Sequence, residues 1–547
     1  MSDRADQWWG RGLFALAILA MAWQSRTLYI FPVGDSLNNW YGDESWLISE
    51  ERTQIETGIS HHPYALGATI NHQVGLFLGN TWLTSTIYGI PAMVFAHSFP
   101  LIAIGRTVTV FLAFLTLLVL YVILVRWRVP HLYAGFTTLL LVTTPAFTLA
   151  SHSARMDLLL SLGVMIVAAL HAELLATHKP FSVRIAFAYG FAMMLVGFII
   201  WPHMLTLLLF AAVYTVLRLS GRRIVPMFGA ALGAIVGLAL LCGVYYALTG
   251  ELSAYGTHSQ HTQFAEVSAQ KPIAHLFSRS VQWTNLIQRF ELLKAGAPML
   301  SLAFIIAVLA CITSIAVRHP TSEHGSRSRE LFIVTLLILL GWLLFQGSVP
   351  YYLSHILCLV ALASGMGLSL VGARIGLSHV TAITVSAVAI SLMVLHVRLV
   401  NAVETTSRTI TEHQHRAIRK LEQHIHIDAT TMHFAQPRVL AELPCAPGLE
   451  LDTSIALMVP SFLSFPERDE PAEQTLTRFG VRYVLRYKTA NDSLSIASLP
   501  AINRIVESSA DVVDTAQGYM FDMGRDYRTP LLGAQDTMIL YRLRTHL

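Results

Sequence analysis

Long apolar runs, separated by short polar segments, fill the first 400 residues of this chain. An α-helix needs about 20 mostly apolar residues to cross the hydrocarbon core of a bilayer, and on this criterion we predict about eleven membrane-spanning helices. They cover residues 12–31, 100–126, 132–150, 157–177, 184–201, 203–218, 224–247, 297–317, 330–346, 353–371 and 378–398. The pattern therefore predicts a mostly α-helical, polytopic membrane protein.

One apolar stretch, from Arg184 to Arg218, is too long for a single span. Proline lacks a backbone N–H and breaks a helix when it lies in the interior. Pro202, between Trp201 and His203, therefore predicts a hairpin that divides the stretch into two spans.

The distribution of Lys and Arg predicts the orientation of the spans, because cytoplasmic loops carry an excess of positive charge. With a cytoplasmic N-terminus, the basic residues near span ends collect on the cytoplasmic side: Arg4, Arg11, Arg126, Arg128, Lys179, Arg184, Arg218, Arg222, Arg223, Arg318, Arg327, Arg329 and Arg374. The short loops on the other side contribute Arg155. An odd number of spans then places the C-terminal region outside.

Three long segments are predicted on the outer side: a first loop over 32–99, a loop over 248–296 and a tail from Asn401. We divide the chain into a transmembrane domain, residues 1–400, and an extracytoplasmic domain, residues 401–547. Function concentrates in loops that a rigid scaffold holds in place. We therefore expect the functional site on the outer side.

The composition changes from Asn401 onward. Residues 405–425 form a polar pattern typical of a helix, and three strand-like runs follow at 438–443, 481–487 and 537–543. Helical patterns between the runs predict a small α/β domain.

Composition excludes several classes of protein. The chain is 54% hydrophobic and 13% charged, whereas soluble domains carry about 25% charged residues. The net charge of +4 is spread over loops and gives no case for nucleic-acid binding. Four cysteines imply no disulfide framework. The first apolar run contains Gln24 and Arg26 and lacks a small-residue cleavage site, so we expect a retained span and not a removed signal.

Two adjacent carboxylates, Asp43 and Glu44, follow the first predicted span. The next residues, with Trp46 among them, suggest a helix along the membrane surface. His61-His62-Pro63 and an apolar segment over 71–96 follow, and Pro91 argues against a full span there. An N-cap is the alternative role for Asp43, since Asp before a helix accepts backbone hydrogen bonds.

With Arg155-Met156-Asp157 at the start of the fourth span, these motifs resemble the GT-C superfamily of polytopic glycosyltransferases. The similarity is greatest to bacterial relatives of protein O-mannosyltransferases and lipid A aminoarabinose transferases. It implies a bacterial inner-membrane enzyme whose active site lies at the periplasmic face. Such an enzyme moves a sugar from a polyprenyl-phosphate donor to a lipid, glycan or protein acceptor, with inversion.

The resemblance implies that Asp43 takes the proton of the acceptor hydroxyl, which is work that a carboxylate can do. Glu44 would orient its neighbours or act on Asp43 as a nearby like charge. Arg155 is the candidate for holding the donor phosphate, with snorkelling at the interface as its alternative role. His203 takes the place where some relatives have a lysine. Asp157 would pair with Arg155, bind substrate, or mark a helix start.

Further candidates come from other segments. Tyr352 and His355, near the start of the tenth span, are expected to line the lipid headgroup, although tyrosines at that depth also form aromatic belts. His61 and His62 are expected to contact substrate. The basic residues of the long outer loop are reserves for the phosphate: Lys271, Arg279, Arg289 and Lys294.

Histidine pairs such as His258-x-x-His261 and His413-x-His415 have spacings that metal sites use, but no Cys or carboxylate accompanies them at fixed spacing. Some members of the superfamily use a divalent metal with a DxD-type motif. Because Asp43-Glu44 lacks that spacing, we expect metal-independent catalysis with no cofactor.

Three alternatives remain open. A transporter or lipid flippase would place ionisable residues near the bilayer midplane and show repeated halves, and the spans contain almost no acids. A structural or assembly protein of the membrane is the second alternative. The third keeps the enzyme class but uses a lipid-diphosphate donor, as an oligosaccharide transferase or ligase would.

Overall fold

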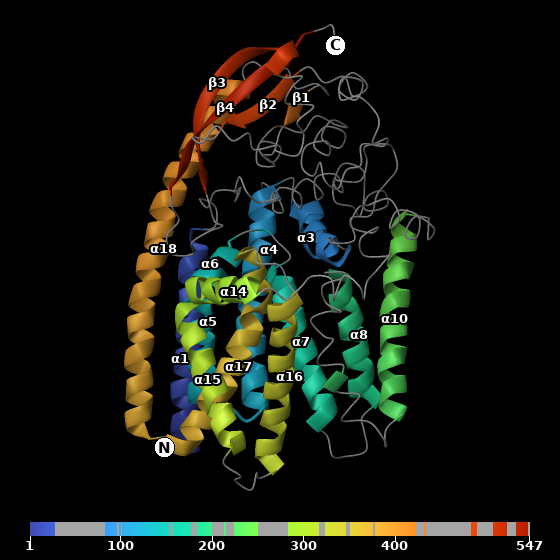
Figure 1. The fold of residues 1–547 in the computed structure, drawn as a ribbon, viewed down its shortest axis with the longest axis vertical. Coiled ribbons are helices and arrows are strands. Elements are labelled where there is room, and N and C mark those ends of the chain that lie inside the picture. The colour runs from blue at the N-terminus through green and yellow to red at the C-terminus, as the bar shows by residue number, and fades with distance from the viewer. Residues whose placement is uncertain are drawn as a thin grey trace.

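The computed structural model describes residues 1–27, 82–95, 98–99, 101–152, 154, 157–176, 183–199, 213–214, 224–249, 283–316, 323–345, 350–375, 378–422, 431–433, 483–488, 507–521 and 532–544. These residues form a bundle of long helices with a small β-sheet beyond one end (Figure 1). The N-terminus lies at the opposite end of the bundle. We call the two ends the sheet end and the N-terminal end.

The described helices follow the chain in this order: α1 (Asp3–Ser25), α3 (Trp82–Phe95), α4 (Leu101–Arg126), α5 (His131–Val142), α6 (Pro145–Ala150), α7 (Asp157–Ala176), α8 (Val183–Ile199), α10 (Ile224–Thr249), α14 (Trp283–Gly296), α15 (Pro298–Ala316), α16 (Glu323–Phe345), the 3₁₀-helix η2 (Pro350–Ile356), α17 (Leu357–Ile375) and α18 (His379–Glu422).

The long apolar helices identify an integral membrane protein. Within the described residues, four segments are long and apolar enough to cross a bilayer: Ala103–Arg126, Asp157–Leu175, Leu353–Gly372 and His379–Thr405. Shorter apolar helical segments occur at His131–Val142, Val183–Val196, Phe228–Leu240, Pro298–Ala310 and Glu330–Leu343. Ten of the eleven predicted spans overlap described helices, and the predicted span at 203–218 lies almost wholly outside the described residues.

The predicted span over 132–150 is divided into two helices, α5 and α6. The first ends at Val142 with Thr143 as its C-cap. Thr144 caps the second, because its hydroxyl accepts a hydrogen bond from the N–H of Phe147 at 3.3 Å. Pro145 follows as the first residue of α6, a position where its missing N–H costs nothing.

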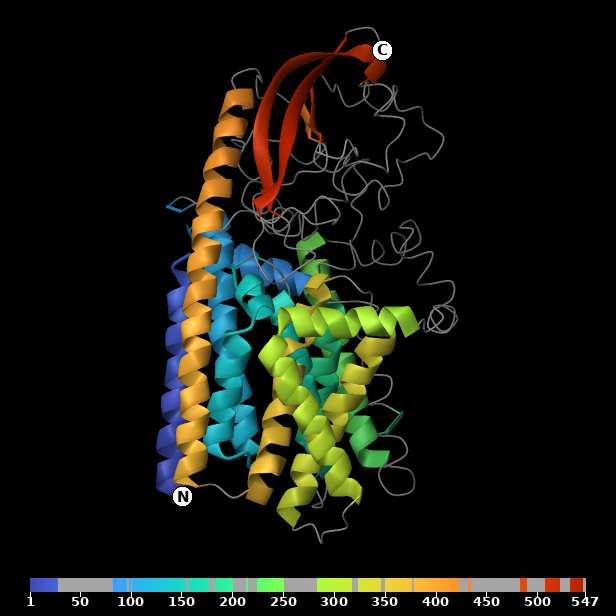
Figure 2. The same cartoon turned by 60° about the vertical axis from the view of Figure 1, so that its left-hand side comes forward.

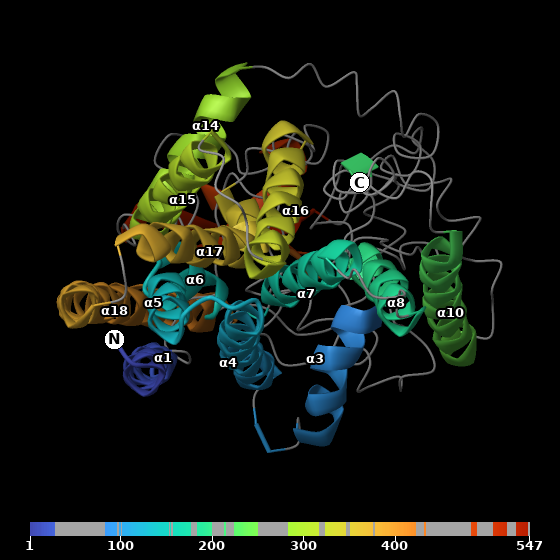
Figure 3. The same cartoon turned by 90° about the horizontal axis from the view of Figure 1, so that it is seen from below.

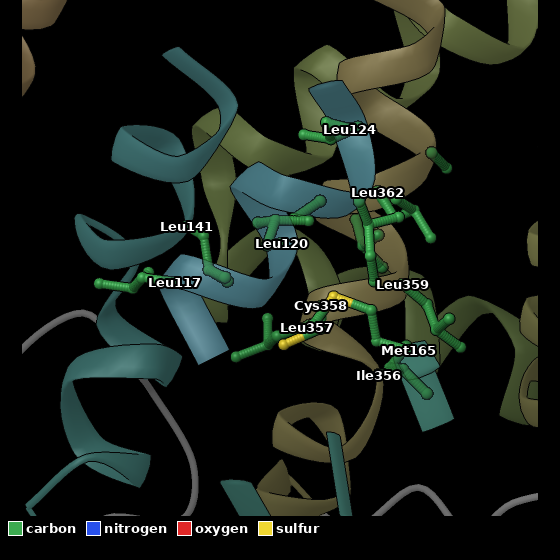
Figure 4. Close-up of a cluster of buried hydrophobic side chains, with 14 of the residues drawn as sticks. Leu117, Leu120, Leu124, Leu141, Met165, Ile356, Leu357, Cys358, Leu359 and Leu362 are labelled. Atoms are coloured by element: carbon green, nitrogen blue, oxygen red, sulfur yellow. The ribbon is translucent and has the colours of Figure 1, made fainter. Parts of the chain in front are cut away.

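The core of the bundle is apolar and lies around α7, which packs against α4, α8, α16 and α17 (Figure 3). Figure 4 shows the part of this core where leucines of α4 meet Leu141 of α5, Met165 of α7 and the start of α17. Cys358 is fully buried there and behaves as a small apolar side chain.

Glycines allow some helices to approach very closely. A Cβ on Gly10 of α1 would overlap the backbone of His131 in α5, and one on Gly135 of α5 would overlap the backbone of Gly10. Asp6 strengthens the same contact, since its carboxylate accepts hydrogen bonds from the N–H groups of His131 and Leu132 at 2.8 and 3.0 Å. The N-terminal ends of α1 and α5 are therefore fixed side by side.

Helices α8 and α10 also pack through glycines, and they run parallel. Gly229 meets Ala186, Gly233 meets Phe187, and Gly237 meets Met194, so the contacts advance in the same direction along both helices. Two helices with one span between them in the chain run in the same direction, so the parallel pair agrees with the span predicted at 203–218.

The last helix of the bundle, α18, continues beyond the membrane-spanning segment to the sheet (Figure 2). We predicted a span and a separate polar helix, and the structure joins them into one helix of 44 residues. Arg26 at the end of α1 holds Glu404 of α18 in an ion pair of 2.7 Å. Near the C-terminal end of α18, Lys420 contacts Asp514 of the sheet at 2.9 Å.

The sheet has four described strands in the order β1-β2-β4-β3: β1 (Thr431–His433), β2 (Tyr483–Lys488), β3 (Ala510–Phe521) and β4 (Leu532–Leu543). β1 and β2 are parallel, and the other pairs are antiparallel. The predicted runs at 481–487 and 537–543 correspond to β2 and β4, whereas 438–443 lies outside the described residues. β3 was not predicted.

Candidate functional site

The candidate site lies at the sheet end of α7, where Asp157 meets His355 of η2. The imidazole Nε2 lies 2.6 Å from the Asp157 carboxylate oxygen Oδ1. Both side chains are only 3% exposed. The two residues are 198 positions apart in the chain, so the contact joins distant segments at the end of the bundle.

Local structure accounts for the position of each group. Asp157 occupies the first turn of α7, where the positive end of the helix dipole stabilises a carboxylate. His355 lies in the last turn of η2, directly before α17. A second contact holds the same junction, because the N–H of Cys358 donates to the hydroxyl of Ser161 at 3.4 Å.

A buried imidazole beside a carboxylate can do two things. The carboxylate fixes the orientation and the tautomer of the ring, and it stabilises the protonated ring as a buried ion pair. A ring held in this way can donate a hydrogen bond to an anionic oxygen or move a proton. Asp157 and His355 are thus suited to a reaction in which negative charge develops nearby.

The structure brings together two of the nine predicted site residues, Asp157 and His355. Tyr352 lies in η2, three residues before His355, and its side chain is not described. The other candidates lie outside the described residues: Asp43, Glu44, His61, His62, Arg155 and His203. The sequence offers Arg155 as a partner for Asp157, and the structure pairs Asp157 with His355.

Two arginines are buried in helices near the sheet end. Arg106 in the second turn of α4 is 2% exposed, and Arg289 in α14 is 6% exposed. The Nη1 group of Arg289 donates to the backbone carbonyl of Leu343 in α16. Arg289 was among the reserve candidates for a phosphate, whereas Arg106 was missed. The sequence does contain a signal for Arg106, because an ionisable residue inside a membrane span indicates a functional role by default.

Within the described residues, no group of three or more His, Cys, Asp or Glu side chains is arranged to hold a metal ion. The histidines of the predicted metal-like spacings, His258 with His261 and His413 with His415, have no described side chains.

Solved structures show which fold these elements make. The crystal structure of ArnT from Cupriavidus metallidurans bound to undecaprenyl phosphate aligns with 98% of this chain and 98% of its own, with a TM-score of 0.53 and 14% sequence identity. The apo structure of the same protein aligns with 97% of this chain and 98% of its own, at a TM-score of 0.51 and 13% identity. The chain has the GT-C fold. The fold resemblance expected from the sequence is thereby confirmed.

The GT-C likeness extends over both the helical bundle and the C-terminal region, since nearly all of each chain is covered. An oligosaccharyltransferase from Archaeoglobus fulgidus in the apo form has a TM-score of 0.49 and 12% identity, over 88% of this chain and 69% of its own. No protein-family model matches the sequence, and none of the curated proteins matches it.

Proposed function

We propose that this protein is a glycosyltransferase that moves a sugar from a polyprenyl-phosphate donor to a lipid, glycan or protein acceptor. The observation that carries the proposal is the GT-C fold over almost the entire chain, shared with a protein whose crystal structure contains undecaprenyl phosphate. The donor would be a membrane lipid, which suits a bundle whose helices present apolar side chains on their outer surface.

The reaction is placed at the sheet end, which corresponds to the outer face of a bacterial inner membrane. The excess of Lys and Arg in the predicted cytoplasmic loops supports this orientation. The N-terminus and the sheet lie at opposite ends of the bundle, as an odd number of spans requires (Figure 1). The buried Asp157–His355 pair lies at the same end as the sheet.

In the proposed mechanism, the hydroxyl oxygen of the acceptor forms a bond to the anomeric carbon of the donor sugar. The bond between that carbon and the phosphate oxygen breaks on the opposite face, and the configuration inverts. Asp43 takes the hydroxyl proton, and the phosphate leaves with the bonding electron pair as the polyprenyl phosphate. Glu44 lies beside the base, and His61 and His62 contact substrate in this proposal.

The leaving phosphate gains negative charge as the bond breaks, so donors placed around it accelerate the reaction. Arg155 and His203 are proposed to bind it, with Tyr352 close by. His355 is proposed to donate to a phosphate oxygen, while Asp157 holds the ring and balances its charge. This arrangement supplies positive charge without a metal ion, and the proposal requires none.

The test is transfer by the purified protein in lipid nanodiscs from a panel of radiolabelled polyprenyl-phosphate sugars. Wild type and Asp43→Asn are compared, each with and without a chelator. We expect transfer by wild type in both conditions, and loss of transfer with retained binding of undecaprenyl phosphate in Asp43→Asn. Retained turnover in Asp43→Asn would remove Asp43 from the role of base, and loss of wild-type transfer with chelator would establish a metal requirement.

The same panel examines the donor. Wild-type protein that transfers only from a diphosphate-linked sugar would replace the monophosphate donor. Wild-type protein that binds none of the donors would contradict the proposed function.

A further inference from the structure

A buried polar network joins the end of α1 to the end of α6, next to the candidate site. His152 lies at its centre, with both ring nitrogens in contact with oxygen atoms. Nδ1 lies 2.5 Å from the carbonyl oxygen of Thr148. Nε2 lies 2.6 Å from the hydroxyl of Thr27 and 2.9 Å from the carbonyl oxygen of Gln24. The first contact lies within its own segment, and the other two cross to α1.

Further bonds connect the same two segments. The side-chain amide of Gln24 donates to the hydroxyl of Ser151 at 2.8 Å, and the hydroxyl of Thr148 donates to the Gln24 amide oxygen at 3.3 Å. The five polar side chains of the network are at most 1% exposed: Gln24, Thr27, Thr148, Ser151 and His152. Buried polar groups are costly unless they are paired, so this network fixes one arrangement of the two segments.

The contacts of the ring show where its hydrogens point. Nδ1 faces the carbonyl oxygen of Thr148, which only accepts, so a hydrogen on Nδ1 is directed toward Thr148. Nε2 faces the carbonyl oxygen of Gln24 and the hydroxyl of Thr27, and that hydroxyl itself donates to the Gln24 carbonyl at 2.8 Å. A hydrogen on Nε2 is therefore directed toward α1, and the contacts on both sides of the ring fix its orientation.

His152 is connected to the candidate site along two routes. Asp157, in the first turn of α7, follows His152 by five residues in the chain. The helix before it, α6, packs against η2, which carries His355. A displacement of His152 would therefore move Asp157 and η2 relative to each other.

We propose that His152 is a positioning residue, which uses its bond to α1 to hold Asp157 against His355. Its effect on catalysis rests on the proposed function, and its effect on the Asp157–His355 contact does not. The bond that matters is the one from Nε2 to Thr27 and Gln24, because it is the side of the His152 ring that crosses to α1, whereas Nδ1 contacts its own segment.

Two substitutions separate the two sides of the ring. In His152→Asn, the shorter amide reaches the position of Nδ1 and keeps only the local bond to Thr148. In His152→Gln, the longer amide reaches the position of Nε2 and keeps the bond to α1. Thr27→Val removes the hydroxyl on the α1 side at nearly constant volume. His171 supplies the matched control. It is a buried histidine near the C-terminus of α7, at the end of the bundle far from the sheet, and it is bonded to the hydroxyl of Tyr189 at 2.8 Å.

The kinetic measurement is kcat and KM for transfer from the polyprenyl-phosphate donor that wild type uses. We expect His152→Asn to lower kcat by about tenfold or more, as misplacement of reacting groups does. His152→Gln is expected to restore most of the rate, and His171→Asn to leave it unchanged. Equal rates for His152→Asn and His152→Gln, or an equal loss in His171→Asn, would overturn the proposal.

The second measurement needs no activity. The thermal unfolding temperature is measured for His152→Asn, His355→Asn, His171→Asn and the two double variants that contain His355→Asn. If His152 positions the pair, the loss from His355→Asn is smaller once His152→Asn is present, while the losses from His171→Asn and His355→Asn add. Additive losses in both double variants would overturn the positioning role. Coupled losses in a protein that neither binds nor transfers any donor would uphold the positioning role and overturn the proposed function.

Discussion

Helix α7 carries a buried histidine contact near each of its ends, and the two differ in what they connect. At the sheet end, Asp157 meets His355 at 2.6 Å, and the partners are 198 residues apart. Toward the N-terminal end, His171 meets the hydroxyl of Tyr189 at 2.8 Å, and the partners are 18 residues apart in adjacent helices. Both contacts are well buried.

Burial alone therefore does not identify a functional histidine. The His171 ring and the Tyr189 hydroxyl are hydrogen-bonded, their rings lie edge to face at 4.9 Å, and the contact joins α7 to α8. Asp157 and His355 combine groups that carry opposite charges when the ring is protonated, and they lie where α7, η2 and α6 meet. A pair that can be charged, at the end of the bundle that carries the sheet, is the one suited to chemistry on a phosphate.

The largest expected difference between the two ends comes from Asp157→Asn. The amide keeps the shape of the carboxylate but removes the charge that balances a protonated His355. We expect kcat/KM for transfer to fall by about 100-fold, the size of effect seen when a group that stabilises transition-state charge is removed. The measurement is donor transfer in nanodiscs, with size-exclusion and thermal unfolding as checks of folding. A variant that is folded and as active as wild type would assign the pair to structure alone.

The next effect concerns binding. His355→Gln removes the ring that we place on the donor phosphate, and a hydrogen bond to a charged group contributes about 1.5–3 kcal/mol. We expect undecaprenyl phosphate to bind about tenfold or more weakly, because about 1.4 kcal/mol corresponds to a factor of ten. Equilibrium binding of the labelled lipid phosphate checks this. Unchanged affinity, with transfer still impaired, would move His355 from phosphate binding to proton transfer.

The sequence was most informative where the thickness of the bilayer's hydrocarbon core sets the length of a helix. The run over 100–126 became α4, Leu101–Arg126, and the run over 157–177 became α7, Asp157–Ala176. It was less informative where a local bond competes with the apolar pattern. Counting apolar residues joined α5 and α6 into one span, although Thr144 followed by Pro145 is a cap and a helix start.

The strand β3 was missed because it does not alternate regularly. Its register shifts between Val512 and Asp514 and again between Tyr519 and Phe521, so the two-residue period is interrupted twice. The candidate site was predictable only in its parts. The sequence indicates Asp157 and His355 as separate candidates, but nothing in a single sequence shows that residues 198 positions apart are in contact. Arg106 does not follow from the distribution of charge among the loops, because it lies inside the span of α4.

A smaller effect is expected at the contact between His171 and Tyr189. Tyr189→Phe removes one hydroxyl from His171, and a typical intramolecular hydrogen bond contributes about 1 kcal/mol to stability. We expect the free energy of unfolding to fall by about that amount, with transfer and donor affinity unchanged. Denaturant unfolding and the transfer assay measure the two quantities. A loss of transfer as large as that of Asp157→Asn would remove the distinction between the ends.

The smallest effect is expected at an exposed pair in the sheet, where Arg544 donates to Asp511 at 2.7 Å. The hydrogen bond from this guanidinium lowers the pKa of the Asp511 carboxyl. A lowered pKa favours the folded state above the ordinary pKa of Asp, about 3.9, and the stabilisation is lost as the pH falls through the lowered value. Asp511→Asn should thus lower the unfolding temperature by about 1 °C or less at neutral pH, since exposed ion pairs contribute little. When thermal unfolding is measured from pH 7 to pH 3, the unfolding temperatures of wild type and Asp511→Asn should converge at the acid end. A difference in unfolding temperature that grows with acidity would contradict the pairing. Because solvent screens Asp511–Arg544 and protein surrounds Asp157–His355, the contrast between this variant and Asp157→Asn measures what burial adds to a pair of charges at the same end of the molecule.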